Sequence, residues 1–159
     1  MKAREIMNAS PATVSPAARI SDVARTVLRE GDQGVPMVDG NGRLLGIVTE
    51  DDLVSKHARV HAPVYLGFLG GVLPLDSRRT KEELRHVLSV CARDIMSTDV
   101  PTASPETEVE DIASMMVEEK QNPVIILEGG RIVGKISHRE IIQLLIQEEE
   151  DEGTDAGST

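Results

Sequence analysis

A hydroxyl and a carboxylate lie three residues apart, directly after an apolar run in the first third of the chain. Leu44 opens a stretch that reads as a buried strand, Thr49 ends it, and Asp52 falls in the first turn of the next helix. These positions bring the hydroxyl, the carboxylate and the free amides of the helix start to one place. The carboxylate can accept hydrogen bonds from a ribose diol, and the hydroxyl and amides can donate to a phosphate. The alternative reading is a strand-end hydroxyl with a helix-capping acid.

The other reactive side chains do not combine into a catalytic or metal site. His57 and His61 are four residues apart, which suits a metal, but no third ligand is apparent nearby, and surface histidines are the alternative that we favour. His86 and Cys91 are five apart, which is a poor spacing for one helix face. We therefore expect no enzyme, no metal and no cofactor, and we expect Cys91 to be a small core residue.

Composition excludes several classes of partner. The chain has 159 residues, and its 17 Lys and Arg against 27 Asp and Glu give a net charge of −10, which is wrong for binding nucleic acid through phosphates. Tyr65 and Phe68 are the only aromatic residues, so bases cannot stack on an aromatic platform. The apolar run at 62–75 is interrupted by Pro and Gly and is shorter than the roughly 20 residues of a membrane span. We expect a soluble, cytoplasmic protein that binds neither nucleic acid nor membrane.

The chain contains the same unit twice. Shifted by 89 residues, it matches itself at a series of identical positions before residue 25, and after a Gly-rich turn that is one residue shorter in the second copy the offset becomes 88. A hairpin turn tolerates such a deletion because each strand keeps its register. The matches include Arg4/Arg93, Ile6/Ile95, Met7/Met96, Thr13/Thr102, Ser15/Ser104, Pro16/Pro105, Asp22/Asp111 and Ala24/Ala113, then Arg43/Arg131 and Gly46/Gly134, with Thr49 aligned with Ser137.

Each copy predicts the order strand, helix, strand, strand, helix. Helical spacing begins near Ser21 and near Ile112, and two apolar strands joined by a Gly-rich turn follow in each copy. A capping-box pattern from Thr80 predicts a connecting helix, and the loop at 62–75 is either a partner site or a linker. We expect a first repeat at 1–60, a loop and connecting helix at 61–90, a second repeat at 91–147 and a disordered acidic tail at 148–159.

The repeated motif resembles a known family. Gly46 to Asp52, preceded by Val35 to Asp39, is similar to the signature of cystathionine-beta-synthase (CBS) domains: Gly, apolar, any residue, Thr or Ser, two of any kind, Asp. Gly134 to Glu140 is similar too, with Glu140 in place of the Asp. The resemblance implies an α+β tandem pair, or Bateman module, in which two β-α-β-β-α copies are related by a pseudo-twofold axis that leaves two clefts. It also implies a non-enzymatic sensor of AMP, ADP, ATP or S-adenosylmethionine, often as a homodimer.

These arguments predict a ligand cleft between the repeats, with occupancy signalled to a separate, unknown partner. Val14 and Met37 are expected to form an apolar slot for the purine, and backbone groups near Thr13 and Pro36 to supply specificity. The predicted nucleotide-binding residues are Thr13, Val14, Pro36, Met37, Thr49, Asp52, Ser137 and Glu140.

The two motifs differ in charge. Three consecutive carboxylates at 50–52 surround the first, whereas Lys135, His138 and Arg139 surround the second. Because like charges repel a polyphosphate unless a cation such as Mg²⁺ intervenes, we expect any phosphate to lie toward these three cations. The alternative is that Lys135 and Arg139 are solvated surface charges. A rival function for the whole chain is a ligand-free interaction scaffold that uses the 62–75 loop.

Overall fold

The computed structural model describes residues 1–30, 34–55 and 90–155, the last five of these by their backbone alone. The predicted 62–75 loop, the connecting helix and the three histidines at 57, 61 and 86 lie outside the described residues. None of the described helices is long and apolar enough to cross a membrane.

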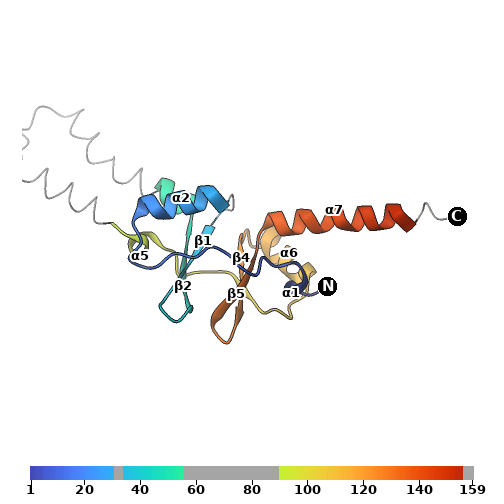
Figure 1. Ribbon diagram of the computed structural model, residues 1–159, viewed down its shortest axis with the longest axis horizontal. Helices are drawn as coiled ribbons and strands as arrows, with labels where there is room; N and C mark the ends of the chain where they lie inside the picture. The colour runs from blue at the N-terminus through green and yellow to red at the C-terminus, as the bar shows by residue number, and fades with distance from the viewer. Residues whose placement is uncertain (31–33, 56–89, 156–159) are drawn as a thin grey trace, which may run out of the picture.

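Secondary structure follows the predicted order in both repeats, which confirms the α+β class (Figure 1). The first strand of the first repeat is reduced to a parallel bridge between Val14 and Met37, whereas the second repeat keeps a two-residue strand. The elements are α1 (Ala3–Ile6), α2 (Ile20–Glu30), β1 (Gly34–Val38), β2 (Leu44–Thr49), a helical stretch at 50–55, α5 (Ala92–Ile95), β3 (Thr102–Ala103), α6 (Val109–Glu118), β4 (Val124–Glu128), β5 (Arg131–Ile136) and α7 (His138–Asp155).

The strands form two small sheets that meet side by side. β1 pairs with β2 and β4 pairs with β5, both antiparallel, and β3 lies parallel to β4 at the edge. The two hairpins touch at their turns, where Ile132 N donates to Gly42 O at 3.4 Å and Arg43 bridges Arg131. In Figure 1 the hairpins lie next to each other below the helices. The pseudo-twofold relation of the repeats is therefore visible in their sheets.

The opening segment of each repeat packs on the other repeat. Ala3 N donates to Thr107 O at 2.8 Å in the second repeat, and Ala92 N donates to Ala18 O at 2.9 Å in the first. The following residues bridge the far hairpins in the same way, Asn8 with Lys135 and Ser97 with Ile47. Figure 1 shows α1 beside α6 and α5 beside α2. The sequence predicts the duplication but not this exchange.

Two aliphatic cores result, and each one contains a residue from the exchanged helix. Ala92 and Ile95 join the core of the first repeat, and Ala3 joins that of the second. The first core is Val14, Val23, Val27, Val35, Met37, Val48, Ala92 and Ile95, and the second is Ala3, Ile112, Met116, Val124, Ile126 and Ile136.

The acidic tail is expected from the sequence to be disordered from residue 148, whereas in the structure α7 continues to Asp155. Gln and Glu are good helix formers, and no glycine interrupts them before position 153, so the helix extends beyond the residues that pack on the core. Cys91 is buried as expected, and its Sγ donates to Asp94 Oδ2 at 3.2 Å.

Candidate ligand clefts

Thr49 and Asp52 meet where β2 ends and the next helix begins. Thr49 N and Thr49 Oγ1 both donate to Asp52 Oδ2 at 2.8 Å, and Asp52 N donates back to Thr49 Oγ1 at 3.2 Å. The pair therefore caps the helix and also fixes the carboxylate in one orientation. Within the described part of the chain no hydrogen bond ends on Oδ1, which leaves that oxygen to accept bonds from another molecule.

Ser137 and Glu140 form the same pair after β5. Ser137 N and Ser137 Oγ donate to Glu140 Oε2, each at 2.7 Å, and Arg139 N donates to Ser137 Oγ at 3.2 Å. The extra methylene of Glu140 thus still delivers one oxygen to both donors. This pair is the more buried of the two, with exposed fractions of 2% for Ser137 and 9% for Glu140.

A cleft of about 300 Å³ lies beside the first pair. Its walls come from both repeats, with Thr49 and Asp52 on one side and residues 119–123 on the other. The lining carries several acids and one cation, Lys120, whose φ of 54° is left-handed. A neighbouring hollow adds Glu50 and Asp51 to this acidic surround.

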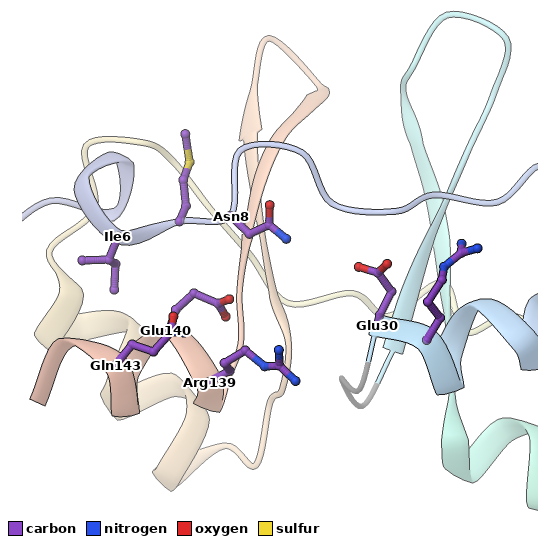
Figure 2. Close-up of a pocket in the computed structure, with 8 residues that line it drawn as sticks. Ile6, Asn8, Glu30, Arg139, Glu140 and Gln143 are labelled. Atoms are coloured by element: carbon purple, nitrogen blue, oxygen red, sulfur yellow. The ribbon is translucent and has the colours of Figure 1, made fainter. Parts of the chain in front are cut away.

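A larger cleft of about 510 Å³ lies beside the second pair, within the size range of small-molecule sites. Figure 2 shows Arg139, Glu140 and Gln143 projecting from α7, Asn8 above them, and Glu30 on α2 across the cleft. Ile6, Met7 and Arg29 complete the lining. Three of its lining residues have equivalents in the smaller cleft at the repeat offsets: Asn8 with Ser97, Glu30 with Glu119 and Glu140 with Asp52.

The four residues predicted to bind the purine occupy the core and its edge. Met37 is fully buried and Val14 is 9% exposed, and both belong to the first core. The Pro36 carbonyl accepts a hydrogen bond from Val14 N at 3.0 Å, and Thr13 is exposed. None of the four lines the cleft beside Thr49 and Asp52, so the purine slot stays a prediction.

The three predicted cations of the second motif are not brought together. Lys135 is fully buried in β5, at the position that Ile47 holds in β2. The backbone N–H of His138 donates to Asn122 Oδ1 at 3.2 Å, and its ring contacts the Asn122 amide. Only Arg139 lines the larger cleft.

Sequence reasoning missed the residues that reach each cleft from the opposite repeat. Arg29, Glu30 and Asn8 line the second cleft, and Ser97 and Asp99 line the first. Asn8 and Ser97 are equivalent at the 89-residue offset, so the repeat itself contained the signal. The sequence does not show that the opening segment of each repeat packs on the other repeat, which places Asn8 and Ser97 at these clefts.

A family model settles the relationship of the chain to known proteins. The CBS domain model matches residues 3–59 and 92–147, which include both motifs and both exchanged helices. The chain belongs to the CBS domain family. The predicted resemblance is thereby confirmed for both repeats.

Relatives of this CBS protein include two from Methanocaldococcus jannaschii, both described as uncharacterized. MJ1426 is 28% identical over 135 residues, which cover 79% of this chain and 80% of that protein. MJ1225 is 29% identical over 130 residues, which cover 81% of this chain and 41% of that protein. The chain therefore spans about two-fifths of the second relative.

Solved structures with the same fold include a CBS domain pair. AcuB from Vibrio cholerae has a TM-score of 0.73 at 20% identity, with 97% of this chain and 96% of that chain covered. CBSX2 in complex with AMP has a TM-score of 0.69 at 17% identity. The CBS domain pair of MJ0100 in complex with 5′-methylthioadenosine and S-adenosyl-L-methionine has a TM-score of 0.69 at 19% identity. Each of the last two matches covers 93% of this chain and 98% of the other. At these identities the likeness establishes the tandem CBS fold.

Proposed function

We propose that this CBS pair is a regulatory module that binds an adenosine-containing ligand in the clefts between its repeats and signals occupancy to a partner protein. The observation that carries the proposal is the Thr49–Asp52 pair, in which the carboxylate is held at 2.8 Å by its neighbour while Oδ1 stays open to a ligand. Ribose hydroxyls are donors that such a carboxylate can accept. The complexes of CBSX2 with AMP and of MJ0100 with adenosyl compounds support this ligand class.

The clefts suit signalling because their walls belong to different repeats. A ligand that touches Asp52 from one repeat and residues 119–123 from the other binds best at one relative orientation of the two. It shifts the balance of orientations by its difference in affinity for them and by no more than that. The role proposed is therefore binding rather than catalysis.

Self-association is part of the proposal. Leu28 and Val54 are 78% and 68% exposed in the first repeat, and their equivalents Val117 and Ile142 are 77% and 55% exposed in the second. Isolated exposed apolar residues are ordinary, but here the same pair recurs at the same places in both repeats. A second copy can cover both pairs at once through a symmetric contact.

Calorimetric titration tests the proposal. AMP, ATP, S-adenosylmethionine and NAD are titrated at a fixed Mg²⁺ concentration into the wild type, Asp52→Ala, Glu140→Ala and the double variant. Each single change removes the carboxylate from one cleft, and we expect it to cost a ligand there about 1.5–3 kcal/mol. Asp22→Ala is the control, because Asp22 pairs with Arg25 on the surface of α2.

Wild-type affinity in the double variant places the ligand elsewhere. No binding of any of the four compounds favours the rival function, a scaffold that docks partners through the 62–75 loop.

A further inference from the structure

Met7 joins the opening segment of the first repeat to the second repeat. It is the C-cap of α1, and the backbone of Asn8 directly after it pairs with Lys135 in β5, with N–O distances of 2.9 and 3.0 Å. In Figure 2 its neighbours Ile6 and Asn8 lie on the segment that passes beside the β4–β5 hairpin. The Met7 side chain therefore lies where two segments from different repeats meet.

The thioether covers the glycine of the second motif. A Cβ atom on Gly134 would meet three atoms first, and all three belong to the Met7 side chain: Sδ, then Cγ at 2.8 Å and Cβ at 3.1 Å. At the equivalent Gly46 the nearest atom is the backbone oxygen of Ser97, at 2.6 Å, and the Met96 sulfur comes second. The second motif therefore makes with a side chain the contact that the first motif makes with backbone as well.

Few apolar contacts hold this segment on the second repeat. α1 has four residues, and Ala3, Ile6 and Met7 are the members of the segment that lie in or against the second core. Its ion pairs with the second repeat join exposed side chains, which contribute little. A short segment with so few buried contacts opens at a lower free energy than the sheet on which it packs.

Met7 is accessible to a small oxidant. It is half-buried and lines the cleft of about 510 Å³, whose lining includes exposed residues. Met37 and Met116, by contrast, are buried in the two cores. Because a thioether is oxidised to the sulfoxide where peroxide can reach it, Met7 should react before these two.

We propose that Met7 is a site of oxidation by hydrogen peroxide, and that its sulfoxide releases the opening segment from the second repeat. One peroxide oxygen is transferred to Sδ, the O–O bond breaks and the other oxygen leaves as water, so the sulfur loses the two electrons that the peroxide gains. The product carries a polar S–O group on the atom that packs against Gly134. Burying that group without a donor is unfavourable, which favours the open segment.

Release changes the contact between the repeats. Ile6, Met7 and Asn8 all line the larger cleft, so they leave its wall together. No step requires an occupied cleft, and peroxide sensing at this position therefore goes beyond the ligand binding proposed above.

Peptide mapping and hydrogen exchange test the site on the full-length protein without ligand. After treatment with hydrogen peroxide, trypsin releases residues 5–19, in which Met7 is the only methionine, and residues 30–43, in which Met37 is the only one. We expect the sulfoxide to form about tenfold faster or more at Met7 than at Met37. Amide exchange in β5 should rise with the fraction of Met7 sulfoxide, while exchange in β1 stays unchanged.

Three variants separate Met7 from the other oxidisable residues. Met7→Leu keeps an apolar side chain that cannot form a sulfoxide, so exchange in β5 should no longer respond to peroxide. Met7→Gln places an unbranched polar side chain there and should raise exchange in β5 without peroxide. Met96→Leu is the matched control at the equivalent position, and in it β5 should still respond. All three keep Cys91, so oxidation of that thiol cannot account for a difference between them.

Two results overturn the inference. One is a Met7 sulfoxide that forms no faster than that of Met37, and the other is a Met7 sulfoxide that forms while exchange in β5 stays the same. A Met7→Leu variant that responds to peroxide as the wild type does would also assign the effect elsewhere. If Met7→Leu does not fold, the wild-type measurements and Met7→Gln still decide. Ligand binding is measured separately by titration, so either proposal can fail without the other.

Discussion

The carbonyl oxygen of Ser97 lies 2.6 Å from the position that a Cβ atom on Gly46 would occupy, and the sulfur of Met96 lies 2.8 Å from it. Gly46 is the glycine of the first CBS motif, and at its equivalent Gly134 the same position is crowded by the side chain of Met7. The first motif needs glycine here because Met96 and Ser97, which follow α5, cross β2 so closely that the Ser97 backbone leaves no room for a Cβ atom on Gly46. The glycine of the signature therefore has a packing role in this fold.

Gly46→Ala is expected to destabilise the protein by about 1–3 kcal/mol, since the methyl group must displace backbone. Gly40→Ala is the matched control, because nothing lies within 4 Å of its Cβ position, and it should change stability by less than about 0.5 kcal/mol. Urea unfolding of both variants measures the difference. Equal urea midpoints for the two variants would contradict the close approach of the Ser97 backbone to Gly46.

The exchange of opening helices makes a paired prediction. Ala3 and Ala92 are fully buried, each in the core of the repeat to which it does not belong in sequence. A buried hydroxyl at either site should cost about 1–3 kcal/mol. Native-state hydrogen exchange should show Ala3→Ser loosening β4 more than β1, and Ala92→Ser the reverse.

Ala17→Ser, at an exposed position, is the control for both variants and should leave exchange in the two sheets unchanged. If Ala3→Ser loosened β1 instead, each opening helix would belong to its own repeat.

The turn at Asp39 predicts a pH dependence. Backbone N–H groups of Arg43 and Asn41 donate to Asp39 Oδ1 at 3.0 and 2.8 Å, and they hold the pKa of that carboxyl below its ordinary value of 3.8. A group with a lowered pKa stabilises the fold above its ordinary pKa, and this contribution is lost as pH falls through the folded value. Asp39→Asn keeps an acceptor oxygen but cannot titrate.

Thermal unfolding of the wild type and Asp39→Asn is compared at pH 7 and near pH 3. The wild type should have the higher melting temperature at pH 7. The difference in melting temperature between the two proteins should become smaller near pH 3. If the difference in melting temperature were the same at both pH values, ionisation of Asp39 would not be its cause.

The repeated apolar pairs predict a surface of self-association. Leu28→Lys combined with Val117→Lys places a charge at the equivalent site of each repeat, and we expect it to shift sedimentation toward the monomer by raising the dissociation constant at least tenfold. Leu45→Lys is the control, since Leu45 is an exposed leucine on β2 outside both pairs. A wild type that sediments as a monomer at every concentration would exclude the dimer.

Much of the architecture could be read directly from the chain. Self-comparison of the sequence gives the 89- and 88-residue offsets. The spacing of apolar residues predicts the strand at Leu44–Thr49 and the helix of α2, because each element buries the face on which its apolar residues lie. The pairing of Thr49 with Asp52 was also foreseeable, since three residues of separation at a helix start is a capping distance. Local order and chemical type are therefore properties of the sequence.

Tertiary structure alone decided which surfaces those elements share. Nothing in the spacing shows that Ala3 packs in the second core, or that Arg29 reaches the cleft of the other motif. Lys135 and Arg139 are near neighbours in sequence, yet one is buried in a sheet and the other faces a cleft. Periodicity reports burial along one element, whereas the identity of the neighbour depends on contacts between segments some ninety residues apart, which only the folded chain brings together.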